Sequence, residues 1–417
     1  MKTLSLKNKT IISVCVFIAV FVALILVATF FDFQVSEILT KNALEPGNYL
    51  ADDLYGVVGE AIGTSPIYLL LAACTGILCW FFIKCFDDNK YKNWFVLLGI
   101  AFALVGIVAW WYYIKDIFKY LIEHAGATLG GIMNGGLAAD TSVYEYRHDS
   151  AVVVCELLIA ATMQALTVLA LRPLKKETLK KLIWWVIAGL AACIVANILI
   201  MLVKEPIGRM RFRSINSDVG QALINDGLVQ GYTPWYVRNG QPDESIINVF
   251  VSKYPGADDA FKSFPSGHTC AAGMSYAMIM LPDVVDFKHK KAGKIACWVT
   301  PILITMLVAI SRIVVGAHYM SDVTFGGTIA FVCMIIAREV FICKGSHFFA
   351  LFPKLAKRSA NDTQIVESGE VESELANESI EDVDIDDINE DIAISSEEAD
   401  VTAKEIADNL RDGGIIE

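Results

Sequence analysis

The sequence predicts an all-α, polytopic membrane protein with about eight transmembrane helices, and three observations support this prediction. Hydrophobic residues make up 55% of the 417 residues, and the mean hydropathy is +0.51, which is too apolar for an ordinary soluble domain. Eight apolar runs approach the ~20 residues that a helix needs to cross a bilayer. The segments between the runs are alternately rich and poor in Lys and Arg, as expected of a chain that crosses a membrane repeatedly.

The apolar runs are expected to form helices in chain order. They lie at residues 11–31, 67–86, 94–115, 151–171, 182–203, 268–285, 295–315 and 324–343. The first run has a long apolar core and no evident small-residue cleavage site, so it is interpreted as a signal anchor and not as a removed signal peptide.

Basic residues indicate which ends of the runs face the cytoplasm. Lysines precede the first run, so the N-terminus is expected inside. The other segments expected inside share this excess of Lys and Arg, and they are 84–93, 172–181, 286–294 and 344–358. The C-terminus is then also cytoplasmic. The outer segment 204–262 breaks the rule because it carries seven cations, and function is the simplest reason to place them there.

The end of the chain has a different composition. Residues 360–417 contain 20 acidic and 2 basic residues and no aromatic residue, so a disordered acidic tail is expected. This tail produces the net charge of −12, because the remainder of the chain is mildly basic.

The ten cysteines all lie in or beside the apolar runs. They form no spaced framework in an outer segment, so no disulfide is expected. No Cys/His ligand spacing is evident either, and therefore no zinc site is expected.

The polar stretch 311–322, which reads SRIVVGAHYMSD, lies at the end of an apolar run. If 317–322 is helical, His318 and Asp322 are four residues apart and share a face. The carboxylate can then hold one imidazole nitrogen and leave the other nitrogen basic. Arg312 adds a permanent positive charge and a fork of N–H donors that can bind an anion.

Two further polar stretches lie at the boundaries of apolar runs. Residues 264–268 read FPSGH and offer a turn, a hydroxyl, a glycine amide and a second histidine. Residues 204–211 read KEPIGRMR and offer cations. The alternation of basic segments places all three stretches on the extracytoplasmic side. Together they indicate a site for an anion, for which phosphate is the obvious candidate.

These stretches resemble the signatures of the type 2 phosphatidic acid phosphatase (PAP2) superfamily, whose members are integral membrane lipid phosphatases. The family's motifs read Lys-x6-Arg-Pro, Pro-Ser-Gly-His and Ser-Arg-x5-His-x3-Asp. Residues 265–268 match the second motif in full. The third motif is matched with correct spacing by Ser311, Arg312, His318 and Asp322.

The first motif is matched with one departure. Lys204 and Arg211 are present, but Phe212 stands where the family has proline. This change affects local backbone rigidity more than phosphate binding, because both cations remain. The resemblance covers roughly residues 94–343.

The resemblance implies three parts in the chain. Residues 1–93 are expected to form an N-terminal extension of two membrane helices. Residues 94–358 are expected to form a catalytic membrane domain with a six-helix, PAP2-like core. Residues 359–417 are the acidic, disordered cytoplasmic tail.

The resemblance also implies a mechanism through a phosphohistidine. His318 is the nucleophile, Asp322 orients it, and His268 protonates the leaving oxygen and then activates water. The groups expected to hold the phosphoryl oxygens are Lys204, Arg211, Ser266, Gly267 and Arg312. Arg209 and Ser311 are candidates for further members of the site. Three fixed cations can replace a metal ion, so no metal or other cofactor is expected.

The implied substrate is an amphiphilic lipid phosphate whose tail stays in the bilayer, such as phosphatidate, phosphatidylglycerol phosphate or a polyprenyl pyrophosphate. No nucleic acid partner is expected, the oligomeric state is left open, and a plasma membrane fits an outward-facing site. A lipid phosphotransferase would use the same site and differ only in its product. A non-catalytic transporter or scaffold would bind lipid without releasing phosphate. Vanadate-dependent haloperoxidases share the motifs, but they are soluble, and the apolar runs argue against them.

Overall fold

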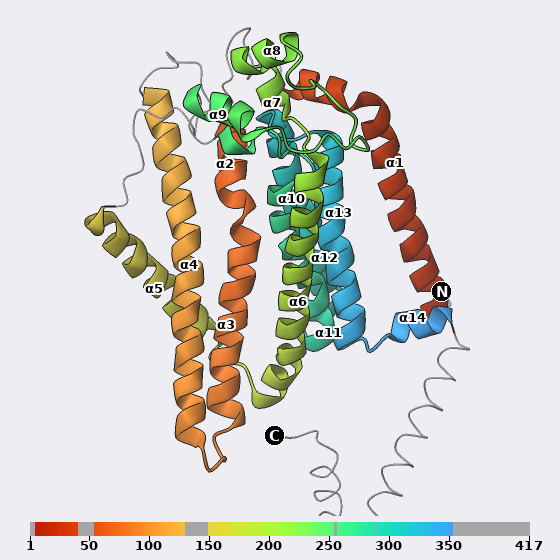
Figure 1. Cartoon of the computed structure of the whole chain (residues 1–417). Helices are drawn as coiled ribbons and strands as arrows, with labels where there is room; N and C mark the ends of the chain where they lie inside the picture. Colours follow the sequence, from red (N-terminus) through yellow and green to blue (C-terminus); the bar gives the residue numbers. More distant parts are fainter. Residues whose placement is uncertain (1–4, 41–53, 130–148, 254–256, 288, 353–417) are drawn as a thin grey trace, which may run out of the picture. The chain divides into compact units, whose positions relative to one another are not determined.

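The computed structural model describes residues 5–40, 54–129, 149–253, 257–287 and 289–352, and all regular elements in this part are helical (Figure 1). Seven helices among these residues are long and apolar enough to cross a membrane. This confirms the all-α, polytopic membrane fold. The acidic tail expected at 359–417 lies outside the described residues.

The long helices are α1 (Leu6–Thr40), α3 (Ser65–Cys85), α4 (Lys92–Leu129), α5 (Ser150–Leu171), α6 (Lys176–Ile207), α12 (Lys290–Val314) and α13 (Met320–Ala337). The short helices are α2 (Leu54–Gly63), α7 (Phe212–Ile215), α8 (Asp218–Asn225), α9 (Glu244–Lys253), η2 (Ala257–Asp259), α10 (Gly267–Gly273), η3 (Met274–Met280), α11 (Leu281–Val284), η4 (Arg338–Ile342) and α14 (Ser346–Leu351).

Two expectations about local structure need correction. The run at 268–285 is not one α-helix, because α10, the 3-10 helix η3 and α11 follow one another there. The helix expected over 317–322 begins only at Met320. The chain turns before it at Gly316, whose φ of 62° is favourable for glycine, and Tyr319 is extended at the N-cap position.

The central core lies between helices that are distant in the sequence. Buried apolar residues of α3, α6, α10, η3, α11 and α13 form one cluster. Within it, the Trp185 indole nitrogen donates a 2.9 Å hydrogen bond to the carbonyl of Ala277. This satisfies the polar end of a large side chain that is otherwise in apolar surroundings.

Helix α1 is longer than a membrane span requires. Its 35 residues correspond to a length of about 52 Å at 1.5 Å per residue, against a hydrocarbon thickness of about 30 Å. Its buried residues are Ala28, Asp32, Ser36 and Thr40, which are four apart and therefore share one face. That face packs toward α12 and α13, so α1 carries a carboxylate to the start of α13.

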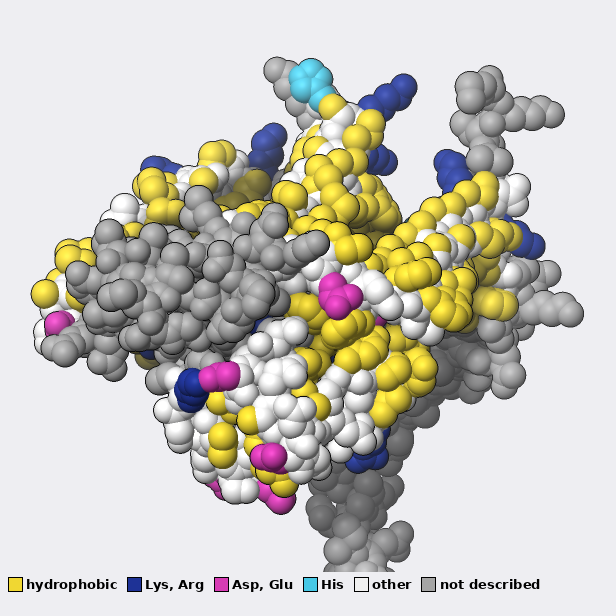
Figure 2. Space-filling view, turned by 90° about the horizontal axis from the view of Figure 1, so that it is seen from above, with side chains coloured by type: hydrophobic (Ala, Val, Ile, Leu, Met, Phe, Trp, Pro, Cys, Tyr) yellow, Lys and Arg dark blue, Asp and Glu magenta, His cyan; other side chains and the backbone are white. Residues whose placement is uncertain are grey.

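A second, smaller core covers the end of the bundle at which α13 begins. It joins residues of α7, α8 and α9 with Phe261 and Tyr319, and Figure 1 shows α7, α8 and α9 gathered at this end. Viewed from the same end, the helices that project from the centre carry mostly hydrophobic side chains (Figure 2), as expected of surfaces in contact with lipid.

Gly208 directs the chain from α6 into this second core. Its φ is 56°, and a Cβ at this position would lie 1.7 Å from the carbonyl oxygen of Gly240. Both the dihedral angle and the close approach therefore require glycine. The turn ends α6 and sends the next residues, which include Arg209, Arg211 and Arg213, across the end of the bundle.

Candidate active site

The three sequence motifs meet at the end of the bundle covered by the second core. Lys204 lies in the last turn of α6, and a Cβ on Gly267 would lie 3.7 Å from its Nζ. Arg312 lies in the last turn of α12. The buried His318 ring lies within the electrostatic reach of Lys204, Arg211, Arg312 and His268. The structure therefore brings together residues that are more than one hundred positions apart.

His318 is held by a backbone carbonyl. Its Nδ1 lies 2.6 Å from the Ser263 carbonyl oxygen, and because a carbonyl can only accept, Nδ1 carries the proton. The Nε2 lone pair is then available for attack on phosphorus. Asp322 Oδ2 lies 3.7 Å from Nδ1, so the nearer acceptor is the carbonyl and the carboxylate acts through its charge.

Burial and the neighbouring cations keep His318 neutral. The side chain is 1% exposed. Burial, followed by the charges of Arg211, Lys204 and Arg312, lowers the pKa of His318 well below its ordinary value. A neutral imidazole is the form that a nucleophile needs.

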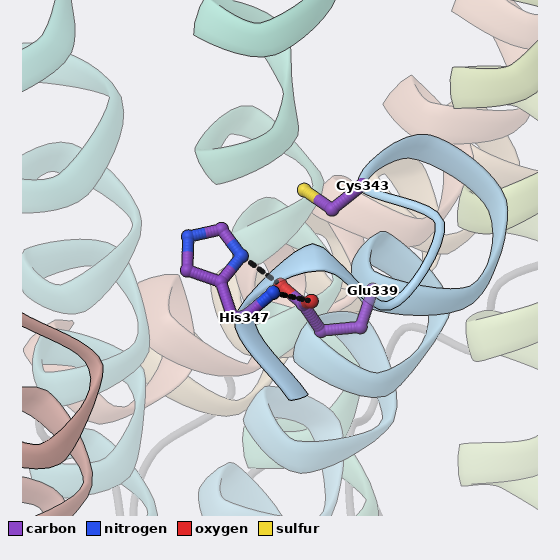
Figure 3. A group of neighbouring side chains, drawn as sticks. All are labelled: Glu339, Cys343 and His347. Carbon is purple, nitrogen blue, oxygen red and sulfur yellow. Dashed lines mark hydrogen bonds and ion pairs between the residues drawn. The ribbon is translucent and has the colours of Figure 1, made fainter. Parts of the chain in front are cut away.

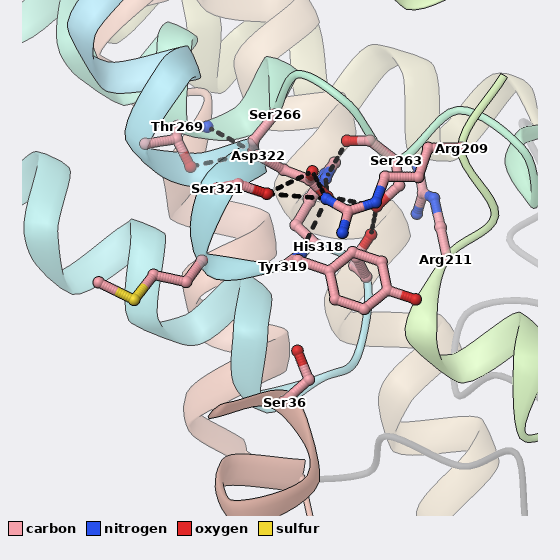
Figure 4. A network of polar contacts seen from close by, with 12 residues as sticks. Ser36, Arg209, Arg211, Ser263, Ser266, Thr269, His318, Tyr319, Ser321 and Asp322 are labelled. Carbon is pink, nitrogen blue, oxygen red and sulfur yellow. Dashed lines mark hydrogen bonds and ion pairs between the residues drawn. The ribbon is translucent and has the colours of Figure 1, made fainter. Parts of the chain in front are cut away.

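Asp322 is fixed from three sides (Figure 4). Its Oδ2 accepts hydrogen bonds from the Ser263 hydroxyl at 2.5 Å and from the Tyr319 amide at 2.9 Å. Its Oδ1 accepts a 2.6 Å bond from Nη1 of Arg209. The hydrogen bond from the Tyr319 amide is also the contact by which a carboxylate at the N3 position stabilises the start of a helix. Asp322 therefore links the start of α13 to the loop that carries Ser263.

Arg209 supports Asp322 and the residues around it through hydrogen bonds. Its Nε donates to the carbonyl of Thr233 at 2.9 Å, and its Nη1 also donates to the Ser321 hydroxyl at 2.8 Å. Its Nη2 donates to Asp32 at 2.8 Å. The guanidinium carbon lies 3.9 Å from the centre of the Tyr319 ring. All three nitrogens are thus occupied, which indicates that Arg209 holds Asp322 in place and does not face a phosphate.

Two other arginines keep donors without partners. Arg312 is fully buried, and its Nη2 donates a 3.0 Å bond to Glu60. Its Nε and Nη1 are buried and have no hydrogen-bond partner among the described residues. Arg211 pairs with Asp259 through Nη2, and its Nε also lacks a partner in the described part of the chain. Buried, unsatisfied donors are costly, and an anionic ligand would satisfy them.

Two serines of the motifs have structural contacts. Ser266 is the N-cap of α10, where its hydroxyl oxygen accepts from the Thr269 amide at 3.3 Å and the Thr269 hydroxyl at 3.0 Å. The Ser266 amide donates to the carbonyl of Asp322 at 3.0 Å. The Ser311 hydroxyl donates to the Val308 carbonyl within α12 at 2.7 Å.

Three residues at the site were not anticipated from the sequence, namely Asp32, Glu60 and Ser263, and a fourth, Arg213, was counted only among the seven cations of segment 204–262. Arg213 is 8% exposed, and its amide donates to the Gly316 carbonyl at 2.9 Å. It is the third arginine of the run RMRFR, which was a usable signal. Asp32 and Glu60 fall in the N-terminal extension, where no motif pointed to them.

A separate group of potential metal ligands lies beyond the C-terminal end of α13 (Figure 3). Glu339, Cys343 and His347 place one ligand atom each within 4.8 Å of one another, although the sequence indicated no such spacing. The Glu339 carboxylate is already paired with Nδ1 of His347 at 2.8 Å and with Nη1 of Arg338 at 3.2 Å. An arginine beside the carboxylate favours an ion-pair cluster over a metal site.

Comparison with known proteins agrees with the motifs. Residues 218–342 match the family model of the PAP2 superfamily. The match includes the second and third motifs, and the first motif precedes it. A curated protein of Schizosaccharomyces pombe named "Probable diacylglycerol pyrophosphate phosphatase 1" is 25% identical over 199 residues, which cover 44% of this chain and 63% of that protein. The alignment thus spans less than two thirds of that relative. No solved structure matches the chain.

Proposed function

We propose that this PAP2-type chain is a membrane lipid-phosphate phosphatase that cleaves a phosphomonoester or pyrophosphate through a phosphohistidine. The observation that carries this proposal is the His318 ring. Its Nδ1 is hydrogen-bonded to a carbonyl, which leaves the Nε2 lone pair available. The ring lies near Arg211 and Arg312, each of which has a donor without a partner among the described residues. A nucleophile beside preorganised hydrogen-bond donors for an anion is the arrangement that phosphoryl transfer requires.

The reaction would proceed in two displacements. Nε2 of His318 attacks phosphorus while the bond from phosphorus to the leaving oxygen breaks, and His268 gives its proton to that oxygen. His268 then takes a proton from water, which attacks the phosphohistidine, and the N–P bond breaks to release phosphate. Lys204, Arg211 and Arg312 stabilise the charge on the phosphoryl oxygens, for which removal of one donor costs roughly 3–4 kcal/mol of barrier.

The membrane helices and the name of the relative support a lipid substrate. A headgroup could reach the site while its apolar tail remains in the bilayer. The distribution of basic residues favours cytoplasmic termini, an extracytoplasmic site and a plasma membrane. We assign 94–358 to the catalytic membrane domain, 1–93 to an extension and 359–417 to a cytoplasmic tail.

The test is phosphate release in detergent, with EDTA present, from phosphatidate, diacylglycerol pyrophosphate, phosphatidylglycerol phosphate and polyprenyl pyrophosphate. Release by the wild type that is abolished in His318→Ala supports the proposal, and EDTA should leave the rate unchanged because fixed cations replace a metal. His289→Ala is the matched control, since His289 is exposed at the start of α12. Acid-labile labelled phosphate on the wild type, absent from His318→Ala, would identify the covalent intermediate.

The opposite results separate the alternatives. Transfer of phosphate to a second lipid with little free phosphate would favour a phosphotransferase. Lipid binding by well-folded protein without any turnover would favour a transporter or scaffold. Full activity of His318→Ala would refute the mechanism.

A further inference from the structure

Helix α2 lies directly against α12, and glycines make this close contact possible. A Cβ on Gly56 would lie 2.0 Å from Cγ1 of Val315, and a Cβ on Gly59 would lie 2.1 Å from Oγ of Ser311. A side chain at either position would require α2, or the side chains of Val315 and Ser311, to move. The next residue, Glu60, is therefore held at the end of α12 where Arg312 lies.

Glu60 contacts two residues of the candidate active site. Its Oε2 accepts a 3.0 Å bond from Nη2 of Arg312, and its Oε1 lies 4.0 Å from Nε2 of His268. The contact occupies only one edge of the Arg312 guanidinium, because Nε and Nη1 stay unpartnered among the described residues. The contact with Glu60 thus leaves two nitrogens of Arg312 for a phosphoryl group.

The charges around His268 explain why a carboxylate is useful at this position. Burial, followed by the charges of Arg312, Arg211 and Lys204, lowers the pKa of His268 to about 4, and the carboxylate of Glu60 opposes this shift. Each cation disfavours an imidazolium, and a nearby carboxylate favours it. A general acid must carry a proton before it can donate one. At 4.0 Å the carboxylate acts through its charge and leaves Nε2–H free to reach the leaving oxygen.

We propose that Glu60 is a positioning residue for the proton donor, whose negative charge favours the protonated form of His268 beside the leaving group. This proposal rests on the proposed phosphatase function and on the acid role of His268 within it. The proton passes from Nε2 of His268 to the leaving oxygen as the P–O bond breaks. Glu60 gains and loses no proton in this step. The N-terminal extension is thereby part of the active site.

The dependence on the leaving group distinguishes this role from a structural one. A lipid alkoxide needs a proton to depart, whereas the p-nitrophenolate released from p-nitrophenyl phosphate departs without one. Glu60→Gln should lower kcat for the lipid substrate by about 10-fold or more, since general acid catalysis contributes 10²–10⁴-fold. It should change kcat for the aryl phosphate less than about 3-fold. The alkaline limb of the kcat–pH profile for the lipid should also move to lower pH.

Three variants complete the design, and thermal unfolding in detergent verifies the folding of each. His268→Ala should lose the lipid activity and should also slow turnover of the aryl phosphate, because His268 activates the water of the second displacement. Glu60→Asp should restore part of the lipid activity. Glu244→Gln removes an exposed carboxylate in the first turn of α9 and should match the wild type.

Other results overturn the proposal. Equal losses on both substrates would show that Glu60 only supports the fold or phosphate binding. Faster turnover or tighter binding of inorganic phosphate by Glu60→Gln would show that the carboxylate occupies the place of the phosphate. Either result refutes only the role of Glu60, and the proposed phosphatase function stands, provided that the wild type hydrolyses lipid and His318→Ala does not. A wild type that releases no phosphate from either substrate class overturns both proposals.

Discussion

Replacing Asp32 by asparagine tests whether α1 stabilises the catalytic framework. Asp32 is fully buried and accepts three hydrogen bonds. They come from Nη2 of Arg209 at 2.8 Å, the Ser321 amide at 2.8 Å and the Ser321 hydroxyl at 2.5 Å. Asparagine has nearly the same shape, but it carries no charge and keeps only one accepting oxygen.

The expected cost follows from these contacts. The Ser321 amide can still donate to the remaining oxygen, whereas the two donors at Oδ2 lose their acceptor. At about 1.5 kcal/mol for each bond to a charged group, the loss is about 3 kcal/mol. This agrees with the ~3–5 kcal/mol expected when one partner of a buried ion pair is removed. Arg209 would then be balanced by Asp322 alone, and a displaced Asp322 should lower kcat by about 10- to 100-fold.

The measurement is thermal or denaturant unfolding in detergent together with lipid-phosphate turnover. Asp226→Asn is the matched control, because Asp226 is exposed at the C-cap of α8. Asp32→Asn should lose both stability and kcat, and the control should lose neither. Wild-type stability and turnover in Asp32→Asn would refute the reasoning, since Arg209 would then need no second carboxylate.

Two further predictions concern His318 and Gly59. Because burial and cations lower the pKa of His318, the ring should remain neutral at pH 6. As the pH falls below ~6.5, the unfolded chain binds a proton on this histidine more readily than the folded protein does, so acidification should lower the free energy of unfolding. NMR of histidine-labelled protein, assigned with His318→Gln, should show this, and an ordinary midpoint near 6.5 would contradict it. Gly59→Ala should lower lipid turnover as Glu60→Gln does, because its Cβ would meet Ser311. Gly231→Ala, whose Cβ would meet only Ile224 at 3.4 Å or more, is the control, and equal activity of the two variants would show that α2 does not depend on close packing.

Hydropathy and motif spacing were sufficient to predict the fold class and the sequence positions around which the candidate site forms. Seven long apolar helices confirm the membrane fold, because about twenty apolar residues have few alternatives to a spanning helix. His318 and Asp322 do lie close together, but not on one helical face as expected. The turn at Gly316 places His318 before α13, where Nδ1 of His318 is hydrogen-bonded to the Ser263 carbonyl. A backbone acceptor of this kind has no signature in the sequence.

The acidic partners of the site could not be predicted for a different reason. Asp32 and Glu60 act through contacts with residues that are 177 and 252 positions away. Neither helix pattern shows which polar residue will face such a partner. The role of Arg209 was hidden for the same reason, since its charge suggested a phosphate ligand and only its four hydrogen bonds identify it as a support for Asp322.

The packing of the first helix affects how the protein can be shortened. A catalytic fragment that begins after residue 93 would keep every motif residue and both histidines. It would also lack Asp32, the second carboxylate of Arg209, and Glu60, the carboxylate beside His268. Such a fragment would leave a buried guanidinium with half of its counter-charge. The smallest unit that retains the site therefore extends nearly to the beginning of the chain.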